Sequence, residues 1–250
     1  MGASPGRSSC DPLCRVQERL ASGPPPILSL IVRPIVAAYH PAMDVVVAGG
    51  HGQVGIRLLR LLADRGHRAR GLIRNPDHAS ELAAVGAEAV ICDMEALDDI
   101  SECCQGADAV VFAAGAGPGS GPERKRTVDY GGAVKLMEAG VPRYVMVSAI
   151  AADRPDEWSD EMRPYYEAKA EADRRLLDSG LDHTIVRPGG LTDDPGTGRV
   201  TVGTGIDRGN VPRDDVAAVL LAVLETPSTV GKVFELVSGE TPVEAAVRSL

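Results

Sequence analysis

A glycine-rich turn constrains the fold of this chain more than any other feature of its sequence. The β-branched run VVVA (45–48) leads into GGHGQVG (49–55), which continues as the amphipathic segment IRLLRLL (56–62). A strand, a glycine turn and a helix in that order bring free backbone N–H groups and the positive end of a helix dipole to one point, where a diphosphate can bind. The alternative is a glycine-rich surface turn without a ligand. The residues predicted to contact a diphosphate are Gly49, Gly50, His51, Gly52, Gln53, Val54 and Gly55.

Strand-like and helix-like segments alternate after this turn, which is typical of a parallel sheet with right-handed crossovers. Only 3% of the 250 residues are aromatic, so the core is aliphatic, and continuous aliphatic strands suit a sheet covered on both faces. We therefore predict an α/β fold, a Rossmann-type doubly wound parallel sheet over residues 43–250 with a small C-terminal substrate-side region. The expected strands are 44–48, 68–73, 88–92, 108–114, 143–148, 183–187, 199–202 and 232–237. The expected helices are 53–65, 78–85, 95–104, 123–139, 164–179, 212–225 and a short final helix.

Residues 1–42 differ in composition from the rest of the chain, because they are rich in Pro, Ser, Gly and Arg. The apolar run 27–39 is interrupted by Arg33-Pro34 and is not followed by a good small-residue cleavage site, so it makes a poor signal peptide. We expect an N-terminal extension that is disordered, or a working protein that begins at Met43.

Charge and cysteine usage argue against several classes of protein. The net charge of −9 at pH 7 disfavours a nucleic-acid partner or an anionic-membrane surface. The five cysteines include no C-x-x-C pair, and the five histidines show no ligand spacing, so we assign no metal and expect reduced thiols in a cytoplasmic protein. No apolar run reaches the roughly 18 to 20 residues that cross a bilayer.

The end of the second expected strand bears on which dinucleotide binds. NAD sites place an acidic residue there, about 20 residues after the glycines, but this strand ends in Arg74. A guanidinium forms charge-assisted hydrogen bonds with a 2′-phosphate, so Arg74 predicts NADP(H) in preference to NAD(H), with Arg70 as an alternative donor. The other possibility is that Arg74 is a solvated residue at a helix start.

Two further strand ends belong to the predicted cofactor site. Asp93, followed by Met94, can accept a hydrogen bond from an adenine amino group, or can cap the helix expected from 95. Small residues end the fourth strand and let backbone approach a dinucleotide, although a simple turn explains them equally well. These residues are Ala113, Ala114 and Gly115.

The candidate chemistry lies at the start of the helix expected over 164–179. Tyr165 and Lys169 are four residues apart and project from one helix face. The ammonium group should therefore lower the pKa of the phenol from its usual value of about 10. Such a phenol exchanges a proton with a carbonyl or alcohol oxygen, and Ser148 at a strand end can hydrogen-bond the same oxygen. Tyr166 competes for this role with a spacing of three residues to Lys169. A chance surface pair is the other interpretation.

Several of these motifs occur in one order along residues 43–250. They are the G-x-x-G-x-x-G spacing of 49–55, Ala113-Ala114-Gly115, Ser148, Tyr165-x-x-x-Lys169 and Arg187-Pro188-Gly189. In this combination the chain resembles the short-chain dehydrogenase/reductase superfamily. It is most similar to the atypical NAD(P)H-binding members like NmrA and biliverdin reductase B, and to the epimerase-like branch.

The resemblance implies further roles for residues after the sixth expected strand. Pro188 and Gly189 would lie beside the nicotinamide, and Arg187 would lie near the cofactor or act as a buried structural ion. Arg213-Asp214-Asp215-Val216 looks like the segment that opens a late helix, where one of the two aspartates would be the cap.

The expected function is an NADPH-dependent oxidoreductase of the short-chain class. It would transfer hydride to a small carbonyl, quinone or flavin-like acceptor, with substrate selectivity in segments 151–163 and 190–210. Two alternatives stay open: a non-catalytic NADP(H) sensor, which the lack of a conspicuous aromatic pocket favours, and a sugar-nucleotide epimerase or dehydratase with bound NAD. The expected partner is a small-molecule substrate, and the expected state is a monomer or homodimer.

Overall fold

The computed structural model describes residues 1–2, 41–117 and 119–250, in two units, 1–39 and 40–250. The expected N-terminal extension lies almost wholly outside the described residues. The second unit contains every helix and strand of the described part of the chain. Within that part, no helix is long and apolar enough to cross a membrane.

A nine-stranded, mostly parallel sheet forms the centre of the second unit, in the order β11-β8-β10-β6-β5-β4-β1-β2-β3. Seven strands from β3 to β10 run parallel, and β8 pairs antiparallel with β10 and β11. The doubly wound Rossmann-type sheet predicted from the sequence is therefore confirmed. The strands are β1 (Asp44–Ala48), β2 (Arg68–Ile73), β3 (Glu88–Ile91), β4 (Ala109–Phe112), β5 (Arg143–Val147), β6 (Asp182–Pro188), β8 (Arg199–Gly203), β10 (Lys232–Ser238) and β11 (Thr241–Pro242).

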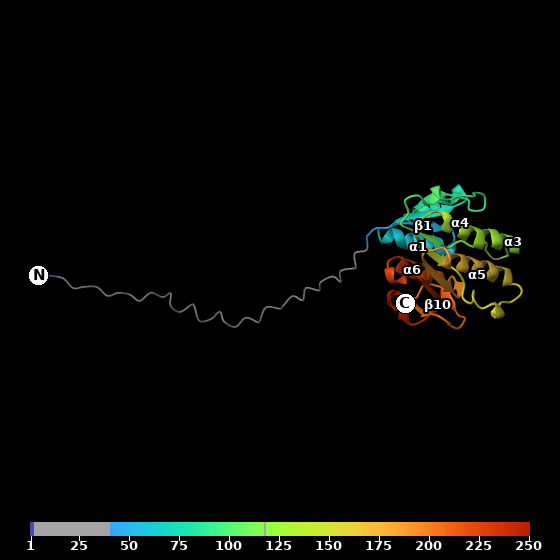
Figure 1. The fold of residues 1–250 in the computed structure, drawn as a ribbon. Helices are drawn as coiled ribbons and strands as arrows, with labels where there is room; N and C mark the ends of the chain where they lie inside the picture. The colour runs from blue at the N-terminus through green and yellow to red at the C-terminus, as the bar shows by residue number, and fades with distance from the viewer. Residues whose placement is uncertain (3–40, 118) are drawn as a thin grey trace. The chain divides into compact units, whose positions relative to one another are not determined.

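Helices cover both faces of the sheet (Figure 1). On one face α1 and α6 pack against each other over residues such as Leu58 and Leu220, and on the other α4 and α5 contribute Leu136 and Leu176. Both cores are mostly aliphatic, as the composition predicts, although Phe234 belongs to the first and Phe112 and Tyr144 to the second. The helices are α1 (Gln53–Asp64), α2 (Ala79–Ala84), α3 (Pro122–Arg124), α4 (Ala133–Glu138), α5 (Arg163–Leu177), α6 (Arg213–Leu224) and α7 (Val243–Arg248). The short turns are η2 (Pro76–His78), η3 (Glu102–Cys104), η5 (Pro155–Glu157) and η6 (Pro227–Thr229).

The helix expected over 95–104 is wrong, because only the turn η3 forms there. The Asp93 carboxylate accepts the backbone N–H of Glu95 at 2.9 Å, and the Asp99 carboxylate accepts that of Ser101 at 2.8 Å. Aspartate side chains that bind nearby backbone groups in this way compete with helix formation.

The helix expected over 123–139 forms as three consecutive helical segments. A wide π-helical stretch, η4 (Lys125–Gly132), lies between α3 and α4. A small separate pair of parallel strands, β7 (Gly190–Thr192) and β9 (Asn210–Pro212), was not expected, because three residues are too few to show a pattern.

Candidate functional site

The glycine turn after β1 is packed so closely that side chains are excluded at three positions. Gly49 has a φ of +85°, and a Cβ there would lie 2.8 Å from the Ala114 Cα atom. A Cβ on Gly55 would lie 2.2 Å from the Gly49 carbonyl oxygen, and one on Gly50 2.7 Å from the Gly71 Cα atom. The turn therefore brings the start of α1 close to the end of β4, as a backbone cradle for an anion requires.

The first residues of α1 open into a cavity with a volume of about 1110 Å³. Gly52 is the N-cap of α1, and no side chain caps this end. The cavity continues along the ends of β4, β5 and β6 to α5 and the segment before β9. Predicted site residues that line it are Gly52, Gln53, Val54, Ala113, Ala114, Gly115, Ser148, Tyr165, Lys169, Pro188 and Gly189.

The remaining predicted cofactor residues are not part of this lining. Gly49, Gly50 and Gly55 pack against neighbouring backbone rather than facing the cavity. Asp93 accepts the Glu95 N–H, which fits its alternative capping role, and Met94 is half-buried with its carbonyl on the Lys135 ammonium at 2.9 Å.

Arg74 and Arg70 have different surroundings. The Arg74 side chain is 59% exposed and pairs with Glu95 at 3.2 Å, so only a solvated ion pair holds it. Arg70 is buried, and its guanidinium donates to Asp44 at 2.7 Å and to the Gln105 carbonyl at 3.1 Å. Asp44 begins β1, whereas the glycine turn follows the last residue of that strand. Arg70 is therefore held at the end of β1 opposite to the glycine turn, and its alternative role as a 2′-phosphate donor is wrong.

His51, in the glycine turn, stacks on His78 with ring centroids 3.6 Å apart and planes inclined by 13°, and it contacts Glu81 at 3.2 Å. These three side chains form the one cluster of potential metal ligands among the residues that the structure describes. Imidazole nitrogens bind metals through lone pairs in the ring plane, and nearly parallel stacked rings keep those lone pairs in separate planes. The potential ligand atoms of the three side chains lie within 4.8 Å of one another, while the two imidazoles are arranged as a stacked pair.

Lys169 lies next to Tyr165, but its ammonium group pairs with other residues. It is buried, its ammonium donates to the Val147 carbonyl at 3.1 Å, and it lies 3.4 Å from the Asp129 carboxylate and 5.9 Å from the Tyr165 ring centroid. Burial raises the pKa of Tyr165, and the Asp129 carboxylate raises it further. The expectation that Lys169 lowers this pKa is therefore wrong, because desolvation and a neighbouring carboxylate outweigh the ammonium.

Asp129 is the clearest functional candidate that sequence reasoning missed. It belongs to η4, is 1% exposed, lines the cavity, and also accepts the backbone N–H of Ala116 at 3.1 Å. An aspartate inside an expected helix carries no signal of its own. Leu191, Arg208 and Asn210 also line the cavity and lie in the segment 190–210 expected to set substrate selectivity, whereas Ser120, Lys125, Ile150 and Arg213 were not anticipated as lining residues.

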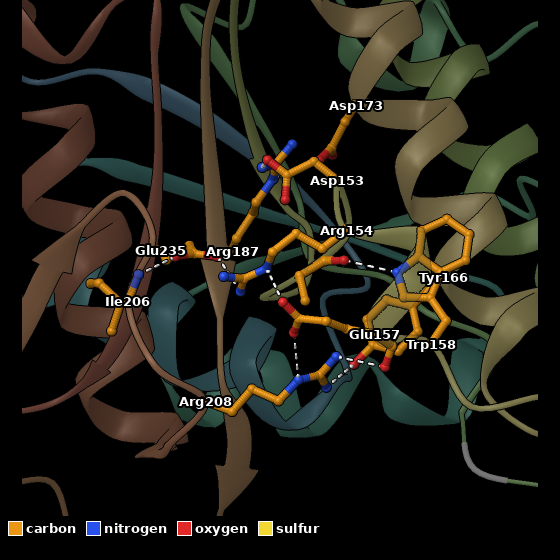
Figure 2. Close-up of polar contacts among 11 residues, drawn as sticks. Asp153, Arg154, Glu157, Trp158, Tyr166, Asp173, Arg187, Ile206, Arg208 and Glu235 are labelled. Atoms are coloured by element: carbon orange, nitrogen blue, oxygen red, sulfur yellow. Dashed lines mark hydrogen bonds and ion pairs between the residues drawn. The ribbon is translucent and has the colours of Figure 1, made fainter.

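Arg187, which is buried, belongs to a network of charged residues beside the main cavity (Figure 2). It lies between the carboxylates of Asp153 and Asp173, and its Nε atom donates to Asp173 at 3.0 Å. Nearby, Arg154 donates to the buried Glu235 at 2.7 Å. These arginines border a second cavity of about 420 Å³. Of the two roles that the resemblance implied for Arg187, its surroundings fit the buried structural ion.

Neither aspartate caps α6, so that expectation is wrong. The N-cap position is Pro212, and the buried Asp215 accepts the backbone N–H groups of Thr197 and Gly198 at 3.0 and 2.8 Å. Asp214 accepts from Arg57 at 2.7 Å. Both carboxylates therefore tie α6 to neighbouring segments instead of to its own first turn.

Comparison with known proteins agrees with this geometry. Residues 49–227 match a family model described as NAD(P)H-binding. A Bacillus subtilis protein, described as the uncharacterized sugar epimerase YhfK, is 40% identical over 83% of this chain and 100% of its own length.

Solved structures match as well, among them the following three. A Bacillus halodurans protein provisionally described as an NAD-dependent epimerase/dehydratase is 38% identical, with a TM-score of 0.80 over 84% of this chain and 100% of its own. The oxidoreductase YlbE of Lactococcus lactis is 28% identical, with a TM-score of 0.75 over 83% and 96%. The anaerobilin reductase ChuY of Escherichia coli O157:H7 is 25% identical, with a TM-score of 0.66 over 78% and 97%. This chain therefore belongs to the NAD(P)H-binding Rossmann-fold family, with the atypical short-chain dehydrogenase/reductases as its relatives.

Proposed function

We propose that this protein is an NADPH-dependent oxidoreductase of the short-chain class, acting on a small carbonyl, quinone or flavin-like acceptor. The observation that carries the proposal is a single cavity bordered at one end by the start of α1 and at the other by Ser148, Lys169 and two tyrosines. A non-catalytic sensor needs only the end of the cavity at the start of α1, where the cofactor would bind.

The residues present fit a dinucleotide. Side chains on Gly49 or Gly55 would collide with the backbone that shapes the turn before α1, so only glycine permits this turn, and about 1110 Å³ leaves room for an acceptor beside the cofactor. When bound, a reduced nicotinamide supplies hydride. The backbone around Pro188 and Gly189 lines the same cavity and would lie beside the nicotinamide ring.

In this proposal each polar residue has one task. Lys169, oriented by Asp129 and the Val147 carbonyl, binds ribose hydroxyls. Ser148 orients the acceptor oxygen. The proton comes from the tyrosine pair at the start of α5, in which Tyr165 has the spacing expected for a partner of Lys169 and Tyr166 competes with it.

Arg74 is the proposed selector of NADPH over NADH. Its pair with Glu95 is exposed, and such pairs contribute about 0–1 kcal/mol, so the guanidinium can turn to a 2′-phosphate at little cost. A charge-assisted hydrogen bond then contributes about 1.5–3 kcal/mol, which is roughly a 10- to 100-fold preference.

Calorimetric titration with NADPH and NADH tests this proposal. Arg74→Ala should lose most of the preference, whereas Arg68→Ala should keep it, since Arg68 is equally exposed but lies at the start of β2 and pairs with Asp44 of β1 and Glu88 of β3. Equal affinities of the unmutated protein for the two dinucleotides would refute the role of Arg74. A panel of carbonyls, quinones and flavins with the tighter cofactor then tests turnover, and the sensor function predicts none.

A second candidate, a sugar-nucleotide epimerase or dehydratase with bound NAD, is favoured by the descriptions of the Bacillus relatives. Tightly bound NAD in the purified protein would support it. We further propose a cytoplasmic location, since Cys92, Cys103 and Cys104 are free thiols.

A further inference from the structure

An aromatic cluster borders the cavity, although the composition gave no reason to expect one. The Trp158 ring stacks on Tyr166 with centroids 5.7 Å apart and planes inclined by 10°, and Tyr165 meets Tyr166 edge-on at 5.4 Å. The Trp158 indole donates to the Ala151 carbonyl at 2.8 Å. Ala151 has a φ of +64°, unlike every other non-glycine residue in the described part of the chain. The loop before α5 is thus held in an unusual backbone conformation that fixes the indole.

Arg208 fixes the hydroxyl end of Tyr166. Its Nη1 atom donates to the Tyr166 hydroxyl at 3.0 Å, while its Nε and Nη2 atoms donate to the Glu157 carboxylate and carbonyl, each at 3.2 Å (Figure 2). Tyr166 is therefore clamped by an indole on its ring and by a guanidinium on its oxygen. Arg208 and Tyr166 both line the cavity.

The direction of this hydrogen bond decides where the phenolic proton points. A guanidinium has five N–H donors and no acceptor, so the Tyr166 oxygen must accept. Among the residues that the structure describes, no acceptor takes the Tyr166 O–H. That proton is free to be donated into the cavity, toward an oxygen of a bound molecule.

Tyr165 lacks these properties. No hydrogen-bond partner orients its hydroxyl within the described ranges, burial and the Asp129 carboxylate raise its pKa, and Lys169 is paired with Asp129. A developing phenolate at Tyr165 would have the Asp129 carboxylate nearby as well as the ammonium groups of Lys125 and Lys169, which lie 5.3 and 5.9 Å from its ring centroid. One at Tyr166 would have the Arg208 guanidinium hydrogen-bonded to its oxygen at 3.0 Å.

We propose that Tyr166 is the proton donor to the acceptor oxygen and that Arg208 is its positioning residue. This inference rests on the proposed reductase function. The acceptor carbon gains the hydride with its two electrons from the reduced nicotinamide, and the C=O π pair moves to the oxygen. That oxygen takes the Tyr166 proton, and the phenolate left beside Arg208 regains a proton from water. The acceptor class is thus one whose reduced atom carries an oxygen, a carbonyl or a quinone.

Steady-state kinetics with NADPH and the best carbonyl or quinone of the panel test the inference. Tyr166→Phe should lower kcat by about 100-fold or more, the usual contribution of a general acid, and Tyr165→Phe should lower it less. The dissociation constant of NADPH and the thermal midpoint should stay close to those of the unmutated protein. A larger loss in Tyr165→Phe than in Tyr166→Phe would overturn the assignment.

The positioning role of Arg208 is tested by a quantity that would not change if the residue were only structural. Arg208→Gln should lower kcat with little change in KM for NADPH, and Arg208→Lys, which keeps the charge and a donor, should recover part of the loss. Equal losses in the two variants would mean that the charge and donor at this position are irrelevant and would contradict the positioning role.

A measurement without turnover separates this inference from the proposed function. Protein labelled at the tyrosine ζ-carbon is loaded with NADP⁺ and titrated with cyclohexanone and a series of related ketones, which form a complex that cannot react. The Tyr166 resonance, assigned by its loss in Tyr166→Phe, should move and that of Tyr165 should not. If NADPH is never oxidised but the Tyr166 resonance moves, the reductase function fails and the donor geometry stands. A Tyr166 resonance that no ketone moves refutes the donor.

Discussion

Replacing Gly55 by alanine probes the construction of the cofactor cradle directly. Gly55 lies in the first turn of α1, where alanine would normally stabilise a helix by about 1 kcal/mol relative to glycine. Here the added Cβ would lie 2.2 Å from the Gly49 carbonyl oxygen, which is far inside ordinary contact distance, and 3.3 Å from the Gly50 Cα atom. The Gly49 carbonyl would have to move by roughly an ångström to reach ordinary contact.

That movement disturbs a turn with little freedom. Gly49 has a φ of +85° and lies against the Ala114 backbone, and its carbonyl accepts the Gly52 N–H at 2.8 Å. Inserting a methyl group into a tightly packed site costs about 1–3 kcal/mol. Because the normal helix gain of about 1 kcal/mol offsets part of this cost, we expect Gly55→Ala to be destabilised by up to about 2 kcal/mol. NADPH affinity should fall about tenfold or more, since the N–H groups of the α1 start are displaced.

Urea unfolding and NADPH fluorescence titration measure the two effects. Gly131→Ala is the matched control, because a Cβ at that helical glycine would lie 3.5 Å from its nearest neighbour, the Arg126 carbonyl oxygen. This control should be as stable as the unmutated protein or slightly more so, with unchanged affinity. A Gly55→Ala protein that behaves like the control would refute the close-packing argument.

Two further substitutions test features away from the cradle. Burial raises the pKa of Cys104 from 9.0 to about 11, so above pH 9 the unfolded thiol ionises first and the stability that this group contributes falls by about 2–3 kcal/mol by pH 11. Cys104→Ala should thus be about 1 kcal/mol less stable at pH 7 but lose less stability between pH 9 and 11 in urea unfolding; parallel curves would contradict this. Asp215→Asn should cost about 1–3 kcal/mol, because the buried carboxylate accepts two backbone N–H groups, whereas Asp214→Asn, at an exposed ion pair, should cost about 1 kcal/mol or less in the same assay. Similar losses in both would exclude a special role for Asp215.

The three aromatic side chains around the cavity bear on the choice between catalysis and sensing. Low aromatic content favoured a sensor when only the sequence was considered. Trp158, Tyr165 and Tyr166 are nevertheless gathered in one cluster, and the two tyrosines line the cavity. A composition averages over the chain and cannot report where its few aromatic residues meet.

Features that depend on neighbours in the chain were predictable. The parallel sheet followed from aliphatic strands that alternate with helical segments, and the cradle followed from three glycines at a spacing of three. The i,i+4 spacing of Tyr165 and Lys169 placed both on one face of α5, where the structure has them. The segment 95–104 failed because its aspartates bind their own backbone, a local competition that a hydrophobic pattern does not reveal.

Sequence alone thus determined the fold, the position of the glycine cradle, and the three strand ends and one helix that border the cavity, because these follow from periodicity and local backbone geometry. The tertiary structure decided the electrostatics. It placed Asp129 on Lys169, turned Arg70 to the far end of β1 and brought Arg208 to Tyr166, from which it is 42 residues distant in the chain. The physical reason is that pKa values and hydrogen-bond directions depend on groups that are close in space, and residues distant in the sequence become neighbours only when the sheet assembles.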